Sequence, residues 1–160
     1  MNRQDLFSTV TRGNEHATNF LMDMVGVLHV WDDLIDRDKP VPPEAVNAAF
    51  ETMLVLIPNN PFYRQNFSAL NPVLVCAINN WHVANILEQG ECEEDLRIAF
   101  ISRSSYIDLI TQVAYIVGGG DWVREIGPHI RRFAHSEGWD GYQRNLKAEK
   151  SARESAIKGD

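Results

Sequence analysis

Apolar residues recur at three- and four-residue spacings through much of this chain, a pattern that predicts amphipathic helices. The clearest case is residues 14–36, preceded by an interruption at residues 11–13, so the first helix is expected to start near Gln4 or near Asn14. Asn14 suits the N-cap, because a short polar side chain there accepts a hydrogen bond from the first turn. Prolines at positions 40, 42 and 43 end this helix, since proline has no backbone N–H to donate.

The same pattern continues through the rest of the chain. Prolines, asparagines and glycines divide it into further helices, predicted at residues 43–57, 62–70, 73–89, 93–117, 121–127 and 128–136. The three consecutive glycines 118–120 are expected to end the helix before them, and residues 138–141 to form a break. No segment alternates apolar and polar residues between turns, as a strand would. The chain therefore predicts an all-α, single-domain bundle of six or seven helices.

The bundle is expected to span residues 1–142, and a length of 160 residues suits one domain. The remaining residues, 143–160, are charged and poor in apolar side chains. They predict either a projecting helix or a frayed tail.

Composition and charge argue against several classes of partner and cellular location. A net charge of −7 argues against the phosphate backbone of a nucleic acid and against an anionic membrane as partners. No run of about 18 apolar residues could cross a membrane, and no apolar stretch near the start resembles a signal peptide. Cys76 and Cys92 are expected to be reduced thiols, with a disulfide between them as the alternative. These features predict a cytoplasmic protein.

One acidic sequence, DDLID at residues 32–36, ends the long first helix. On a helical wheel Asp33 and Asp36 lie one turn apart on the polar face, with His29 one turn earlier and Asp32 at the border. Carboxylates at this spacing can hold Mg²⁺ while the phosphates of a ligand complete its coordination shell. The alternative is a solvated helix face, although the helix dipole disfavours carboxylates at this end.

The sequence DDLID, followed by Arg37, Lys39 and Pro40, resembles the first Asp-rich motif of class I isoprenoid synthases. Those enzymes are all-α, and in them this motif holds Mg²⁺ against a diphosphate. The resemblance implies Asp32 and Asp36 as Mg²⁺ ligands and a phosphorylated small molecule as the ligand. Arg37 and Lys39 are then candidates for contact with its phosphates.

Two later helices carry polar residues among apolar ones. His82 and Asn85 share a face of one helix, and Arg97 and Asp108 belong to a polar stripe on the next. Buried polar groups must be paired, so the pattern predicts a polar cavity inside the bundle. The residues expected to line it are Asp33, Asp36, His82, Asn85, Arg97 and Asp108. In the alternative, Arg97 pairs with an acidic neighbour and His82 is a satisfied core histidine. Arg103 is expected to point elsewhere.

Two classes of function follow from these features. In the first, the protein binds Mg²⁺ and a phosphorylated small molecule, and an enzyme of this kind would ionise or hydrolyse a diphosphate. In the second, it is a non-enzymatic helical interaction or assembly module, including a homo-oligomer with Trp139 and Tyr142 as candidate contacts. The sequence shows no nucleophile with an adjacent base and no glycine-rich phosphate loop.

Overall fold

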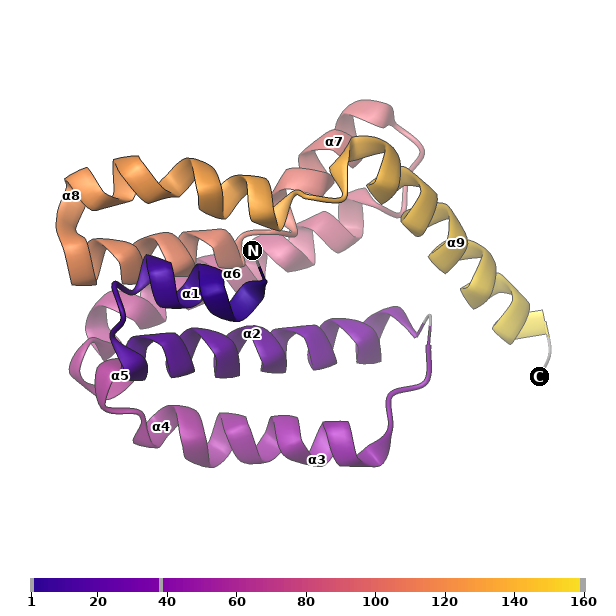
Figure 1. Cartoon of the computed structure of the whole chain (residues 1–160). Coiled ribbons are helices and arrows are strands. Elements are labelled where there is room, and N and C mark those ends of the chain that lie inside the picture. The colour runs from indigo at the N-terminus through magenta and orange to yellow at the C-terminus, as the bar shows by residue number, and fades with distance from the viewer. Residues whose placement is uncertain (1, 38, 159–160) are drawn as a thin grey trace.

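Helices make up most of the computed structural model, which describes residues 2–37 and 39–158, with side chains as far as residue 155 (Figure 1). No strand occurs among these residues. The predicted all-α, single-domain bundle is confirmed.

The first two helices, α1 (Arg3–Val10) and α2 (Glu15–Asp36), are separated by a tight turn. Arg12 and Gly13 have positive φ angles of 54° and 76°, which reverse the chain between the two helices. The Asn14 side chain accepts a hydrogen bond from a backbone N–H of the first turn of α2. The predicted N-cap is therefore confirmed.

Three further elements, α3 (Pro43–Glu51), η1 (Thr52–Leu56) and α4 (Ile57–Asn59), form one continuous helix that packs along α2 (Figure 1). The predicted end before Pro58 is wrong by two residues. η1 is a π-helix, so its last backbone hydrogen bond spans five residues rather than four. The backbone hydrogen bonds have thus changed to the wider π spacing before Pro58. Because proline has no backbone N–H, Pro58 needs no acceptor in the preceding turn.

The next helices are α5 (Pro61–Gln65) and α6 (Phe67–Leu87). The predicted boundary at Pro72 is wrong, because α6 passes through this residue and the break lies at Asn66. The Asn66 side chain donates to the backbone oxygen of Phe62 at 2.9 Å, a local bond that competes with the helical pattern. Pro72 lies on the exposed side of α6, where water can hydrate the carbonyl that loses its partner.

A turn separates α7 (Glu93–Ser102) from α8 (Tyr106–Ala134), so the single helix predicted over residues 93–117 is wrong. The hydroxyl of Ser105 donates to the backbone oxygen of Ser102 at 2.6 Å. Such a side-chain bond stabilises a turn at the expense of the helix.

The long helix α8 folds back on itself at its three glycines (Figure 1). Gly119 is non-helical, with φ 74° and ψ −175°, and the two arms of α8 run in opposite directions. A Cβ atom on Gly118 would lie 2.5 Å from Cδ1 of Trp122, so glycine is needed beside the reversal. The predicted helix stop is thus observed as a sharp reversal, whereas Pro128 lies inside the second arm instead of starting a helix.

The last helix, α9 (Gly138–Lys158), extends away from the bundle (Figure 1). It runs through the break predicted at residues 138–141, of which only Gly138 has an unusual backbone, with φ 69°. Tyr142 and Leu146 are buried, so the first turns of α9 are docked on the rest of the chain.

The core lies between α1, α2, α6 and the two arms of α8. Its largest fully buried side chains are Phe7, Phe20, Leu6, Leu21, Leu70, Ile107, Leu109, Ile110 and Ile130. Cys76 and Cys92 are both free, as predicted. Among the described residues, no helix combines the length and the apolar character needed to cross a bilayer.

Candidate functional site

Arg103 lies in the turn between α7 and α8 and is the centre of a largely buried charged cluster. Its Nη1 donates to Oε1 of Glu88 at 2.6 Å. Its Nη2 reaches Oδ1 of Asp32 at 3.2 Å and Oδ2 of Asp36 at 3.4 Å. Three carboxylates, two from α2 and one from the end of α6, thus surround one guanidinium. We call these four residues the Arg103 cluster.

Local structure brings the four side chains together. Asp32 and Asp36 are four residues apart on α2, so both project from the same side of that helix. Glu88 is the C-cap residue of α6. Arg103 is the C-cap residue of α7 and keeps helical backbone angles, so its side chain reaches α2 from the end of that helix.

The Arg103 cluster is shielded from water and carries more negative than positive charge. The side chains of Arg103, Asp36 and Glu88 are 17%, 11% and 8% exposed. Burial by itself would lower the pKa of Arg103, but the three carboxylates outweigh it and raise that pKa above its ordinary value. Burial, together with the negative charge of Asp32, raises the pKa of Asp36. The cluster thus holds its guanidinium firmly charged while its deepest aspartate is harder to ionise than usual.

Helix α9 closes the cluster from one side. The hydroxyl of Tyr142 donates to Oε1 of Glu88 at 2.5 Å, and burial with this bond raises the pKa of Tyr142. The Tyr142 ring also packs on Phe100 of α7 and on Trp139, with ring centroids 5.0 and 5.6 Å apart. The two aromatic residues predicted as oligomer contacts are therefore engaged within the chain, and Tyr142 is buried.

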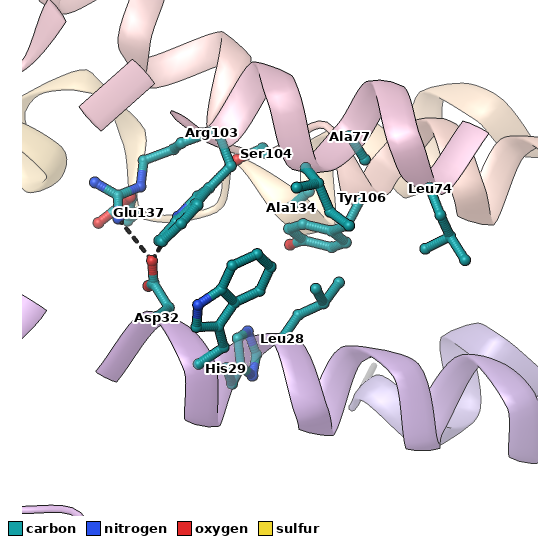
Figure 2. Close-up of a pocket in the computed structure, with 13 residues that line it drawn as sticks. Leu28, His29, Asp32, Leu74, Ala77, Arg103, Ser104, Tyr106, Ala134 and Glu137 are labelled. Atoms are coloured by element: carbon teal, nitrogen blue, oxygen red, sulfur yellow. Dashed lines mark hydrogen bonds and ion pairs between the residues drawn. The ribbon is translucent and has the colours of Figure 1, made fainter. Parts of the chain in front are cut away.

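A cavity of about 210 Å³ lies beside the Arg103 cluster, with walls from α2, α6 and the region around α8 (Figure 2). Its polar and aromatic lining consists of His29, Trp31, Asp32, Trp81, Arg103, Ser104, Tyr106 and Glu137. The remainder of its lining is aliphatic, including Leu28 and Leu74. In Figure 2, His29 and Tyr106 approach the cavity from opposite sides.

Asp32 belongs to both the cluster and the cavity. The indole Nε1 of Trp81 donates to Oδ1 of Asp32 at 2.7 Å, and this oxygen is the one that Arg103 also approaches. The rings of Trp31 and Trp81 lie 4.9 Å apart between centroids and are tilted by 44°. The carboxylate of Asp32 is thus held in place by an indole and a guanidinium at the edge of an aromatic wall.

Some of the residues predicted for the site do come together. Asp32 and Asp36 are both in the Arg103 cluster, and His29 shares the cavity wall with Asp32. Burial lowers the pKa of His29. Asn85 lines a separate pocket with Asp36 and Glu88, and its buried Oδ1 has no hydrogen-bond partner in the described part of the chain.

The other predicted residues lie apart on the surface. Four of them take part in three ion pairs, Asp33–Lys39 at 2.8 Å, Arg97–Glu93 at 2.7 Å and Asp108–Arg131 at 3.5 Å. Arg37 is exposed just after α2, and His82 is exposed with its ring edge against Trp31 and Trp81. The central cavity predicted from six polar residues is therefore not formed, because the turn after α7 separates Arg97 from Asp108.

The predicted site did not include Arg103, Glu88 or Tyr142. On a helix over residues 93–117 Arg103 lies on a different face from the polar stripe, and the packing of the helices decides which carboxylates that face meets. The sequence SRSS at residues 102–105 carries the relevant signal, because serine hydroxyls that bond to the backbone favour turns.

The carboxylates that the isoprenoid synthase resemblance assigns to Mg²⁺, Asp32 and Asp36, face the guanidinium of Arg103. In the part of the chain that the structure describes, no three His, Cys, Asp or Glu side chains are grouped so that they could hold a metal ion. Arginine keeps its charge in proteins, so Mg²⁺ would have to compete with Arg103 for these oxygens. The Mg²⁺ site stays a prediction that rests on the spacing of the acidic residues and on the resemblance.

Comparisons of the chain with protein-family models, curated proteins and solved structures find no match. A functional assignment therefore rests on the geometry of this chain.

Proposed function

We propose that the protein is a non-enzymatic helical assembly module that pairs with a second copy of itself through α3 and η1. The observation that carries this proposal is a run of four consecutive apolar residues, Met53, Leu54, Val55 and Leu56, whose exposed fractions lie between 43% and 67%. Phe50, one turn earlier, is also exposed. We call these five residues the η1 surface.

The η1 surface surrounds much of its helix. Four consecutive residues of a helix point in nearly all directions around its axis, and a helix that is apolar on all sides is normally buried. Yet neither α3 nor η1 contains a buried residue, and both pack along α2 on one side (Figure 1). The other sides form a contiguous exposed apolar patch, which is typical of a protein interface.

The accessible surface area of the chain is larger than that expected of a compact monomer of its mass. Its accessible surface is 9628 Å², whereas a compact monomer of 18.2 kDa is expected to expose roughly 8,100 Å². The difference is roughly 1,500 Å², and a standard interface covers about 800 Å² on each partner. Part of the difference comes from the projecting α9.

A second copy fits the η1 surface because the centre of this surface is uncharged. From Pro43 to Asn59 the charged residues are Glu44 and Glu51, and both precede the run of exposed apolar residues. A twofold axis brings the same residues of two copies face to face. A self-complementary surface must therefore avoid charge at its centre, as this one does.

The substitution Leu54→Glu tests this proposal. It places two like charges opposite each other at the centre of the dimer, so we expect a dimer for the wild type and a monomer for the variant. Light scattering after size exclusion, over a range of protein concentrations, measures the change. Ile86→Glu on α6 is the matched control, because Ile86 is 65% exposed and Leu54 is 67% exposed.

Two results would contradict the proposal. A wild-type protein that is monomeric at every concentration would remove self-association altogether. A dimer that survives Leu54→Glu but dissociates in Ile86→Glu would place the interface on α6 and α7, where Val83, Ile98 and Ile101 are also exposed. Circular dichroism shows whether either variant has lost its helices.

A further inference from the structure

The cavity beside the Arg103 cluster combines aromatic rings with carboxylates. Trp31 of α2 and Trp81 of α6 both line it, with ring centroids 4.9 Å apart. Tyr106 adds a third ring at the start of α8 (Figure 2). The faces of aromatic rings carry negative partial charge, so they attract cations, and indole does so most strongly.

Carboxylates add to the negative potential of this cavity. Asp32 and Glu137 line it directly, and Asp36 and Glu88 lie behind Asp32 in the Arg103 cluster. Arg103 is shared among three of these four carboxylates, and the positive charge of Arg3 acts on His29 and Tyr106 in the cavity wall. Four carboxylates thus stand against two cations, so the region keeps an excess of negative charge. A cation entering the cavity would be attracted both by the rings and by this excess.

The cations that line this cavity are poorly placed to bind an anionic ligand. Both terminal nitrogens of Arg103 already donate to carboxylates, at 2.6 Å to Glu88 and at 3.2 Å to Asp32. The imidazole of His29 is largely neutral near pH 7, because burial lowers its pKa from 6.5. A phosphate would also be repelled by Asp32 and Glu137. The charge distribution therefore favours a cation over the phosphorylated ligand that the resemblance implies.

The size of the cavity restricts the ligand further. Its volume of about 210 Å³ lies between the roughly 150 Å³ of an apolar cavity that takes up benzene and the roughly 300–1,000 Å³ of sites for drug-sized ligands. The cavity therefore suits a compact molecule that is somewhat larger than benzene.

From these observations we infer that the cavity binds a small alkylated ammonium ion. Its methyl groups would lie against Trp31 and Trp81, and its charge would lie near Asp32 and Glu137. The site is separate from the η1 surface, so a monomeric protein would carry it as well.

Choline and 3,3-dimethylbutan-1-ol separate the effect of charge from that of shape, because the alcohol replaces the quaternary nitrogen by carbon. Each is titrated into the ¹⁵N-labelled full chain, and the indole N–H signals of its four tryptophans are followed by NMR. Single Trp→Phe variants assign these signals. We expect choline to shift the signals of Trp31 and Trp81 and to leave those of Trp122 and Trp139 unchanged. The neutral alcohol should bind about tenfold more weakly.

Two charge variants localise the interaction. Glu137→Gln keeps the shape of an exposed side chain and removes its charge, so choline should bind at least about threefold more weakly. Asp121→Asn removes the same charge beside the bend of α8, where the side chain is 97% exposed, and should leave the affinity unchanged. Trp31→Leu should abolish binding, with circular dichroism to check that the variant folds.

Several outcomes would overturn the inference. Equal affinity for choline and the alcohol would show an apolar pocket that does not select for charge. Absence of any shift with choline would remove the site. Pyrophosphate shifting the Trp31 and Trp81 signals while choline does not would establish an anion site instead. Equal loss of affinity in Asp121→Asn and Glu137→Gln would show only an effect of net charge.

Discussion

The hydroxyl of Tyr142 on α9 donates a hydrogen bond of 2.5 Å to Oε1 of Glu88 at the end of α6. The same oxygen accepts from Arg103, so one carboxylate joins α9 to the turn between α7 and α8. The side chain of Glu88 is only 8% exposed, and it depends on these donors for the hydrogen bonds that water would otherwise supply. The first turns of α9 are therefore bound to the Arg103 cluster through Glu88.

Tyr142→Phe should loosen α9 without unfolding the bundle. The substitution removes the hydroxyl but leaves the ring packing and the bond from Arg103 to Glu88, so the free energy of unfolding should fall by about 1 kcal/mol. Hydrogen exchange of the backbone amides in α9 should become faster. Tyr115→Phe is the control, because Tyr115 is an exposed tyrosine of α8. Unchanged exchange in α9 would contradict the role of this bond.

Arg103→Met should destabilise the fold much more strongly. It leaves the carboxylates of Asp32, Asp36 and Glu88 close together without their counter-ion, which is expected to cost about 3–5 kcal/mol at neutral pH. Urea denaturation measures the loss. Arg97→Met is the control, because the ion pair of Arg97 with Glu93 is exposed and should contribute less than about 1 kcal/mol.

The same variant tests the Mg²⁺ prediction. If a cation can take the place of the guanidinium, Mg²⁺ should raise the melting temperature of Arg103→Met by about 3 °C or more and leave the wild type unchanged. Sodium chloride at equal ionic strength controls for screening. Stabilisation of the wild type by Mg²⁺ with pyrophosphate, lost in Asp32→Asn/Asp36→Asn, would instead support the isoprenoid synthase resemblance.

His135 should make stability depend on pH. Its ring packs on Phe100 at 5.1 Å between centroids, and its buried Nδ1 has no hydrogen-bond partner among the described residues. Burial, with the positive charge of Arg131, lowers the pKa of His135 below 6.5. The folded chain thus binds fewer protons than the unfolded chain just below pH 6.5, so the free energy of unfolding rises with pH there and falls on acidification.

His135→Gln should therefore flatten the dependence of stability on pH between about 5 and 7. Urea denaturation at several pH values within this range measures the slope. His129→Gln, which changes an exposed residue on the same helix, should keep the slope of the wild type. Equal slopes for the wild type and His135→Gln would contradict the prediction.

Gly118→Ala should destabilise the reversal of α8. The added Cβ would lie 2.5–2.7 Å from three atoms of the Trp122 side chain, and this overpacking is expected to cost about 1–3 kcal/mol. Gly26→Ala in α2 is the matched substitution, because nothing lies within 4 Å of its Cβ position. Alanine favours a helix over glycine, so this variant should gain about 0.5–1 kcal/mol. Thermal unfolding of both variants separates the two effects.

Local sequence by itself determined where most helices lie and how several of them begin or turn. The N-cap at Asn14 and the interruption of the helix at residues 118–120 depend on neighbouring residues, so short-range rules predicted both, although not the reversal that follows. The predicted ends at Pro58 and Pro72 were wrong because a proline can stay within a helix when the hydrogen-bond register shifts or water hydrates the freed carbonyl.

Only the tertiary structure determined which charged side chains contact one another. The sequence DDLID showed that Asp32 and Asp36 lie on neighbouring turns of one helix, but it did not show what faces them. Arg103 follows Asp36 by 67 residues and reaches it because the packing of the helices brings the end of α7 to the end of α2. Electrostatic energy depends on distance in space and on burial, and neither can be inferred from the spacing of residues along the chain.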